Sequence, residues 1–227
     1  MYEYKNILIV RYGEISLKGM NKPYFERVLE GRIKSAISKL DLAEAQSLSI
    51  VRSDGLITVS GRDTELPVDE ALLTKTILKV FGVASVSPAV RLEDKHIETI
   101  FAAAIDFMHK RVDERNASIG TGIGADKPVT FKIIGKRSDK SYPITSPDMS
   151  ARVGEAVLNA LEPKVKVDVI RPEIALNIHL RQREVFIYDE KFGGFGGLPL
   201  GTNGKGMTLL SGGIDSPVAT WLMAKRG

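Results

Sequence analysis

The residues best suited to chemistry form one run near the end of the chain, Ser211-Gly212-Gly213-Ile214-Asp215-Ser216-Pro217. Gly212 and Gly213 have no Cβ, so the backbone can turn tightly and bring its N–H groups against an anion. Ser216 is a good N-cap and Pro217 suits the first position of a helix, whose N-terminus favours phosphate. Asp215 would repel bare phosphate, so its carboxylate implies Mg²⁺ between the two. The run predicts a loop that binds the phosphates of a nucleotide.

The segments on either side of this run supply the elements that must position it. Residues 207–210 are predicted to form a short buried strand, and residues 218–224 continue as a helix. A strand–turn–helix with ordinary capping is the plainer interpretation, but the six residues together favour a nucleotide. Other glycine motifs fail: Gly204-Lys205 lacks the earlier Gly and the following Ser or Thr of a Walker loop, and Lys127 occupies the third glycine position of a dinucleotide motif after Gly122.

Composition sets wide limits on function. The chain has 227 residues, enough for two domains and part of a third, and a hydrophobic content of 43% that is ordinary for a globular protein. It has no cysteine, which excludes disulfides, cysteine–zinc sites and thiol nucleophiles. Neither a membrane-spanning run nor a signal peptide is evident, so a cytoplasmic location is expected. The formal net charge of +4 permits nucleic-acid binding without requiring it.

Residues 1–90 are predicted to be a ferredoxin-like domain, in the order β-α-β-β-α-β. Residues 6–10 are a continuous apolar strand, and a helix opening at Asn21 and Pro23 carries apolar residues at helical spacing. Ser53-Asp54-Gly55 lies between two apolar runs and indicates a hairpin. A second helix after Pro67 and a strand from Val83 complete the order.

Residues 91–190 are predicted to be a second α/β domain. It would contain a helix from Ile97, a polar glycine-rich loop over 113–128, a strand at 129–134, a helix opening at Ser146-Pro147, and three more strands at 165–167, 174–180 and 185–188. Residues 191–206 hold seven glycines and are predicted to be a linker, one that could close over a ligand. Residues 207–227 would begin a third domain.

Basic residues gather between the strand at 129–134 and the helix at Ser146. The set is Lys132, Lys136, Arg137 and Lys140, with Arg152 on the following helix. Such sets bind phosphate backbones, and Tyr142 could stack on a base or sugar. A solvated loop is the alternative interpretation of these residues taken alone.

Three motifs give the chain a family resemblance. Phe131, Lys136-Arg137, Lys140 and Tyr142, followed by Ser146 and its helix, resemble the THUMP domain, an RNA-binding module of tRNA-modifying enzymes. Ser211–Ser216 resembles the signature of PP-loop ATP pyrophosphatases. The stretch Arg11-Tyr12-Gly13-Glu14-Ile15-Ser16-Leu17-Lys18-Gly19 resembles the opening of the ThiI family of tRNA 4-thiouridine synthetases, whose order is ferredoxin-like domain, THUMP domain, PP-loop domain.

The resemblance implies an activity and a set of partners. ThiI-like enzymes use ATP to adenylate the C4 oxygen of the uracil at tRNA position 8, and pyrophosphate leaves. Sulfur from a persulfide, supplied by a cysteine desulfurase, then displaces AMP. Members can also supply sulfur for the thiazole of thiamine through a sulfur-carrier protein, and such enzymes often act as homodimers.

The resemblance also assigns roles to residues of this chain. Gly212, Gly213, Asp215 and Ser216, with Ser211, would hold the pyrophosphate end of ATP, and Asp215 would be the catalytic residue that binds Mg²⁺. Leu209 and Leu210 would border the adenine. The tRNA would be bound by Lys132, Lys136, Arg137, Lys140, Tyr142 and Arg152, with Lys18, Arg11 and Arg27 extending the surface and Arg181 and Arg183 as weaker candidates.

The sequence departs from the family in its third domain, which needs more strands and a sulfur-carrying cysteine. We therefore expect a fragment that binds tRNA but does not complete an ATP site, and whose last helix lacks a sheet to cover it. Two alternatives stay open: a stand-alone THUMP-type RNA-binding module without catalysis, and another PP-loop ATPase such as a small-molecule amidating synthetase.

Overall fold

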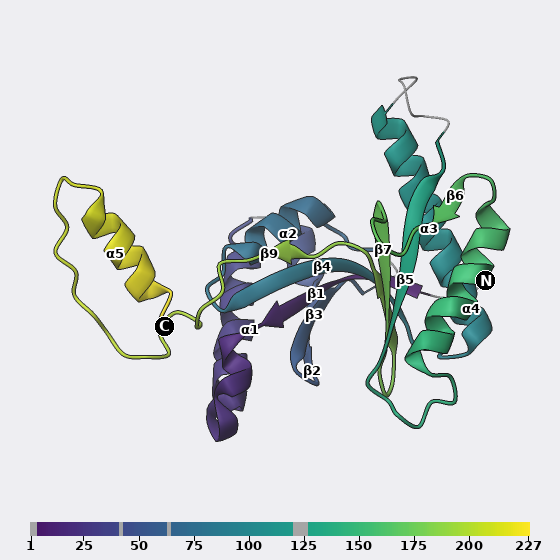
Figure 1. Cartoon of the computed structure of the whole chain (residues 1–227). Coiled ribbons are helices and arrows are strands. Elements are labelled where there is room, and N and C mark those ends of the chain that lie inside the picture. Colours follow the sequence, from purple (N-terminus) through teal and green to yellow (C-terminus); the bar gives the residue numbers. More distant parts are fainter. Residues whose placement is uncertain (1–3, 41–42, 63–64, 120–126) are drawn as a thin grey trace. The chain divides into compact units, whose positions relative to one another are not determined.

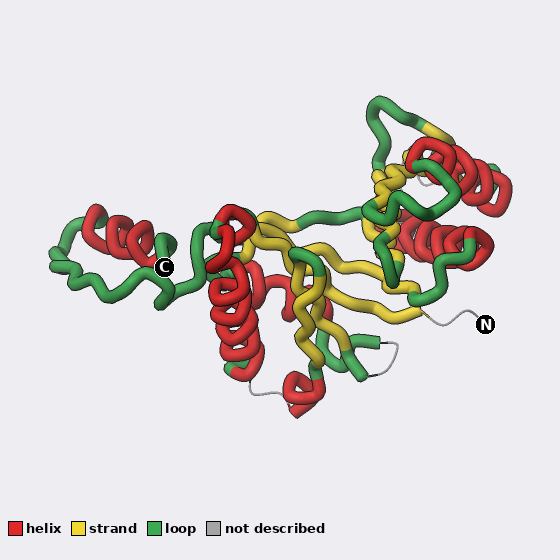
Figure 2. The backbone as a smooth tube through the Cα atoms, turned by 90° about the horizontal axis from the view of Figure 1, so that it is seen from below, coloured by secondary structure: helices red, strands yellow, loops and turns green. Residues whose placement is uncertain are grey.

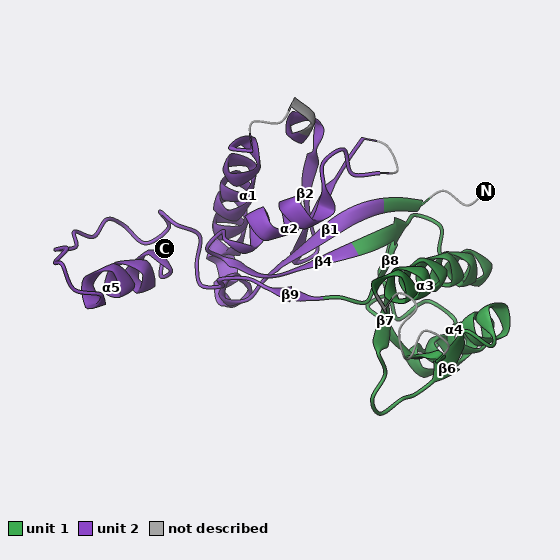
Figure 3. Ribbon diagram, turned by 90° about the horizontal axis from the view of Figure 1, so that it is seen from above, with its two compact units in different colours: residues 1–5, 89–190 green, residues 6–88, 191–227 purple. Residues whose placement is uncertain are grey.

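The chain folds into two compact units in the computed structural model, which describes residues 4–40, 43–62, 65–119 and 127–227. Unit 1 comprises residues 1–5 and 89–190, and unit 2 comprises residues 6–88 and 191–227 (Figure 3). The strands β1 (Tyr4–Tyr12) and β4 (Val83–Leu92) contribute residues to both. In the described part of the chain, no helix is long and apolar enough to cross a bilayer.

Unit 2 contains the predicted ferredoxin-like order. Its elements after β1 and before β4 are α1 (Lys22–Ser38), β2 (Ser49–Ser53), β3 (Leu56–Ser60) and α2 (Glu70–Leu78). The strands lie in the order β2-β3-β1-β4 (Figure 1). Asp54 and Gly55 both have positive φ, which gives the predicted tight hairpin turn. The prediction for this domain's fold is confirmed.

The core of unit 2 is formed by the apolar faces of α1 and α2 against the sheet. Phe25, Leu29, Ile33 and Ile37 repeat along one side of α1 and pack with Leu73 and Ile77 of α2 against β1, β3 and β4. The helix α2 begins at an N-cap, Asp69, whose carboxylate accepts a hydrogen bond from the Leu72 amide at 2.7 Å.

Unit 1 places two helices on one face of a mixed sheet (Figure 2). Its elements are α3 (Ile97–Ile119), β5 (Val129–Arg137), α4 (Ser146–Leu161), β6 (Val165–Val167), β7 (Ile174–Leu180) and β8 (Val185–Tyr188). The strand order is β4-β8-β7-β5-β6, with β5 parallel to both β6 and β7. Met149, Val153, Val157 and Leu161, spaced four apart on α4, are buried against this sheet.

The prediction of a loop over residues 113–128 is wrong for its first part, 113–119. Helix α3 continues through Ile119, and residues 120–126 lie outside the described part of the chain. The polar residues that suggested a loop are the exposed side of the helix: Arg111 pairs with Glu114 at 2.9 Å, while Val112 on the other side is buried. Polarity alone does not distinguish a loop from the solvent face of a helix.

The glycine-rich segment predicted as a linker is partly a bound strand. Phe192 and Gly193 form β9, which pairs with β4. The amides of Gly194 and Gly196 then donate to the carbonyls of Ala84 and Val83 at 3.0 and 2.8 Å. Glycine suits this approach, because a Cβ on Gly194 would lie 2.5 Å from the Val83 oxygen. The first half of the segment is therefore attached to unit 2 rather than free.

The helix α5 (Asp215–Ala224) is held to unit 2 mainly by its C-terminal end. The Lys225 carbonyl accepts from the Leu198 amide at 3.0 Å, and the Gly227 carbonyl accepts from Gly201 and Asn203 at 2.9 and 2.8 Å. Along the helix, the Trp221 ring lies 5.4 Å from Phe81 and 5.5 Å from Phe195 between centroids. Val218, Leu222 and Met223 of α5 are more than half exposed.

Candidate functional site

The basic residues of unit 1 are sorted by the alternation of β5. Val129, Phe131 and Ile133 face the helices, so Lys132 and Lys136 lie on the opposite face of the sheet. Arg137 follows Lys136 directly and, because the strand extends to it, faces the helix side. Lys136 and Arg137 therefore lie on opposite faces of the sheet. The strand predicted from sequence ends at residue 134, so it cannot show this difference.

A tight contact between β5 and α4 fixes the start of that helix. The Gly135 amide donates to the Ser150 hydroxyl at 2.8 Å, and a Cβ on Gly135 would lie 2.6 Å from the Ser146 carbonyl oxygen. The helix is capped one residue before its predicted opening, by Thr145, whose hydroxyl accepts from the Asp148 amide at 3.3 Å and donates to the Asp148 carboxylate at 2.5 Å. The Thr145-x-x-Asp148 spacing is the signal for this cap.

Two of the predicted RNA contacts have partners within unit 1. Arg137 Nη1 donates to the Tyr142 and Ile144 carbonyls at 2.7 and 3.2 Å. The Tyr142 hydroxyl donates to the Lys95 carbonyl at 2.7 Å, and the ring packs against the apolar core. Burial, reinforced by the negative charge of Glu98, raises the pKa of the Tyr142 hydroxyl. Base stacking by Tyr142 stays a prediction.

Among the main predicted RNA contacts of unit 1, Lys136, Lys140 and Arg152 are open to solvent. Lys136 and Lys140 are exposed, Lys132 is half-buried, and within the described part of the chain none of the three forms an ion pair. The acid nearest in sequence, Asp139, pairs instead with Lys95 at 3.2 Å. Arg152 is exposed on α4, with its guanidinium carbon 5.9 Å from the Phe101 ring centroid. These four positive charges remain available to an anionic ligand.

The weaker candidates, Arg181 and Arg183, lie in unit 1, and the residues predicted to extend the surface lie in unit 2. Arg183 is exposed in the turn between β7 and β8, but Arg181 is only 5% exposed, with its guanidinium carbon 5.7 Å from the Phe186 ring centroid. Arg11, Lys18 and Arg27 belong to unit 2. There Arg11 donates to the Ser87 hydroxyl at 2.8 Å, and Lys18 Nζ lies 4.9 Å from the Phe25 ring centroid.

Sequence reasoning missed Lys95. Its ammonium donates to the Asp139 carboxylate and, at 2.8 Å, to the Gln182 carbonyl, so it connects the loop after β5 with the turn after β7. No spacing rule relates a lysine before α3 to a loop more than 40 residues later, since the contact depends on the tertiary fold.

The nucleotide-loop predictions are wrong in two structural details. Residues 207–210 form no strand: Met207, Leu209 and Leu210 are 94%, 89% and 70% exposed, and no strand in the described residues pairs with them. The helix begins at Asp215, with Ile214 at the N-cap position, so Ser216 does not cap it and Pro217 lies in the third position. An apolar run becomes a strand only where another strand accepts its backbone hydrogen bonds.

Ser216 instead closes the loop on itself. Its hydroxyl accepts from the Ser211 amide at 3.0 Å and donates to the Ser211 carbonyl at 3.4 Å. The Ser211 hydroxyl accepts from the Gly213 amide, also at 3.4 Å. Gly212 and Gly213 are exposed at the tip of this turn, and Asp215 stands at the first position of the helix. The turn therefore presents backbone at a helix N-terminus, an arrangement that suits a phosphate.

The donor set also fits Mg²⁺, which usually binds one or two carboxylates together with substrate phosphates. The described residues include no cluster of three or more metal-binding side chains. Asp215 would therefore hold the ion together with phosphate oxygens rather than in a cage of protein ligands, and the ion would supply charge neutralisation there.

Three protein-family models match successive segments of the chain. The ThiI ferredoxin-like domain matches residues 7–87, the THUMP domain matches residues 94–190, and "Thiamine biosynthesis protein (ThiI)" matches residues 201–227. Together with the mixed α/β fold of both units, these matches define a THUMP-containing protein. The chain belongs to the ThiI family.

Individual relatives agree with this placement. The chain is 40% identical over 223 residues to a probable tRNA sulfurtransferase from Caldanaerobacter subterraneus subsp. tengcongensis, covering 98% of this chain and 51% of the relative. A probable tRNA sulfurtransferase from Natranaerobius thermophilus is 38% identical, with 98% and 50% covered. The chain spans about half the length of these curated relatives.

Two solved structures share the fold over nearly the whole chain. PH1313 from Pyrococcus horikoshii Ot3 superposes with a TM-score of 0.79 at 30% identity, covering 98% of this chain and 66% of PH1313. A 4-thiouridine synthetase in complex with RNA and ATP superposes with a TM-score of 0.74 at 28% identity, covering 98% of this chain and 50% of the synthetase.

Proposed function

We propose that this chain is the tRNA-docking part of an ATP-dependent tRNA sulfurtransferase that makes 4-thiouridine at tRNA position 8. The observation that carries the proposal is the presence of two sites on one chain: exposed cations on a THUMP-type unit that form no ion pair with any described residue, and a glycine turn closed by Ser216 at a helix N-terminus. A relative of known structure binds both RNA and ATP, which supports the same two ligands here.

In this proposal each site has a separate task. Lys132, Lys136, Lys140 and Arg152 bind phosphates of the tRNA acceptor end and hold the molecule in register, without reading its bases. The Ser211–Ser216 turn binds ATP phosphates, with Asp215 holding Mg²⁺. The uracil C4 oxygen attacks the α-phosphorus and pyrophosphate leaves. The outer sulfur of a persulfide then attacks C4 and AMP leaves, and a thiol from outside this chain, which has no cysteine, attacks the inner sulfur of the resulting disulfide and releases 4-thiouridine. The proposal includes a cytoplasmic location, a cysteine desulfurase as persulfide donor, sulfur supply for thiamine, and a homodimer.

The docking part of the proposal can be tested with RNA of defined ends. The chain is titrated with a fluorescent, unmodified tRNA transcript, with the same transcript shortened at its acceptor end, and with an unstructured RNA of equal length. We expect the intact tRNA to bind most tightly, because its acceptor end places phosphates where the exposed cations can reach them. Equal affinity for all three RNAs would show charge attraction alone and would contradict the proposal.

A further inference from the structure

The loop between β5 and α4, residues 138–145, is fastened at its base by Arg137. The guanidinium lies on the helix side of β5 and is half-buried. Its Nη1 donates to the carbonyls of both Tyr142 and Ile144, which stand five and seven residues further along the chain. Because Nη1 is directed at two backbone carbonyls of its own loop, Arg137 cannot offer that nitrogen to a phosphate without releasing the loop.

A second set of hydrogen bonds fastens the middle of the loop. Lys95 binds the Asp139 carboxylate through Nζ and accepts the Tyr142 hydroxyl through its own carbonyl. The other Asp139 oxygen accepts from the Ser141 amide at 3.0 Å, and the Ser138 amide donates to the Leu180 carbonyl at 2.9 Å. Lys140 stands between these anchored residues, with its side chain in solvent.

From these contacts we infer that Arg137 is a positioning residue: it holds the 138–145 loop in the shape that presents Lys140 to an RNA phosphate, and does not itself bind the RNA. Tyr142 acts in the same way through its hydroxyl. This inference rests on the proposed tRNA-docking function. Its physical basis is that a loop ordered before binding loses less conformational freedom when the ligand arrives.

A double-mutant cycle separates positioning from contact. The affinity of the chain for the unmodified tRNA transcript is measured over a series of salt concentrations for wild type, Arg137→Ala, Lys140→Ala and the double variant. Each phosphate contact that is lost should reduce the magnitude of the slope of log affinity against log salt by about 0.7–0.9. It should also weaken binding roughly fivefold at physiological salt. If Arg137 positions Lys140, the double variant binds like Arg137→Ala alone, because the Lys140 contact is already lost.

Tyr142→Phe supplies a second readout that keeps the ring and removes the anchor. Loss of the hydroxyl breaks the hydrogen bond to Lys95, so we expect weaker binding that is again not additive with Lys140→Ala. A tyrosine that only stacks on a base would lose nothing in this substitution. If Arg137→Ala does not fold, as judged by thermal unfolding, the Tyr142→Phe and Lys140→Ala cycle decides the question.

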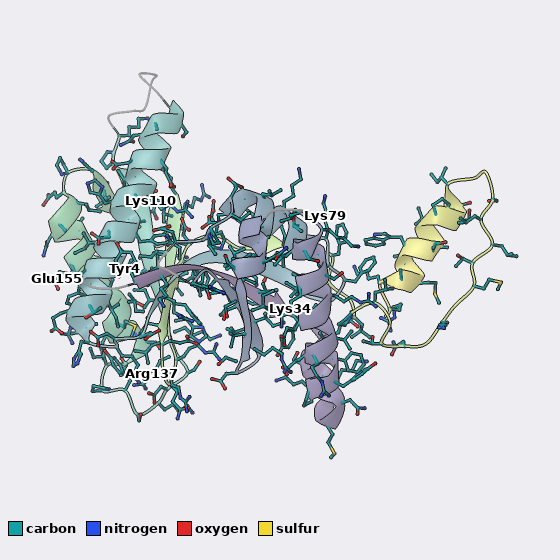
Figure 4. All side chains as sticks on the ribbon, turned by 180° about the vertical axis from the view of Figure 1, so that it is seen from behind. Tyr4, Lys34, Lys79, Lys110, Arg137 and Glu155 are labelled. Carbon is teal, nitrogen blue, oxygen red and sulfur yellow. The ribbon has the colours of Figure 1, made fainter. Side chains whose placement is uncertain are left out.

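The outcomes are distinct for the inference and for the proposed function. If the losses of affinity are additive, and the magnitude of the slope falls by about 1.4–1.8 in the double variant, Arg137 is a phosphate contact. That result would overturn the inference but not the proposed function. Absence of salt-dependent tRNA binding by the wild-type chain would overturn the proposed function and the inference with it. Lys110→Ala serves as the matched control: this exposed lysine lies on α3 toward the opposite end of unit 1 from Arg137 (Figure 4).

Discussion

At the scale of single residues, the candidate RNA site depends on a glycine, Gly135, as well as on its charged side chains. Gly135 permits β5 to approach the first turn of α4 so closely that a Cβ would lie 2.6 Å from one backbone oxygen and 3.0 Å from the Ser150 hydroxyl. This contact joins the strand that carries Lys136 to the helix that carries Arg152. A change at Gly135 should therefore act on stability and on the RNA site together.

Gly135→Ala is expected to destabilise the chain by about 1–3 kcal/mol, because the new methyl group overlaps backbone that cannot easily move. Urea or thermal unfolding measures the effect. Gly154→Ala is the matched control: it lies inside α4 with only the Ile133 side chain near, at 3.7 Å, and should stabilise by about 0.5–1 kcal/mol. Equal effects of the two substitutions would contradict the assigned contact.

The residue scale also shows what sequence could and could not predict about the site. The cations Lys136 and Lys140 are predictable from the local cluster of basic residues between a strand and a helix, since a local excess of charge is visible in sequence. The positioning role that we infer for Arg137 is not predictable in this way. It depends on the strand continuing to Arg137, which places the side chain on the other face of the sheet. Lys95 was missed altogether, because its partners come from distant segments.

At the scale of elements, periodicity predicted more than polarity did. The helices of both units were located from apolar residues at helical spacing, and the β5–β8 strands from short apolar runs. Over 113–119 polarity predicts a loop, but these residues form the last turns of α3. The strand expected at 207–210 fails for another reason, since hydrogen-bonding partners decide whether an apolar run forms a strand.

The helix α5 offers a test at this scale, because Trp221 is the only tryptophan of the chain. Phe195→Ala removes one of the rings packed against it, so we expect the Trp221 fluorescence to shift to longer wavelength and the helix to lose about 0.5–1.5 kcal/mol of packing.

Phe192→Ala is the control for that experiment. Phe192 and Phe195 are equally exposed, at 39%, but Phe195 alone has a ring contact with Trp221. The same spectral shift in both variants would show that the aromatic cluster does not hold α5.

At the scale of the whole molecule, the two candidate sites lie in different units. The exposed cations belong to unit 1, and the Ser211–Ser216 turn belongs to unit 2, where hydrogen bonds from residues 198–203 and the Trp221 contacts hold its helix. The family order of the three segments was predicted from sequence and is confirmed by the comparisons. Residues 207–214, which lead into and form this turn, are exposed.

The central claim, that the exposed lysines of unit 1 bind tRNA phosphates, is tested most directly by the salt dependence of binding. The slope of log affinity against log salt is compared for wild type, the Lys136→Ala and Lys140→Ala double variant, and Lys110→Ala, over about 50–200 mM salt. We expect the double variant to bind more weakly, with the magnitude of its slope reduced by about 1.4–1.8, and the control to match wild type. An unchanged slope in the double variant would contradict the account.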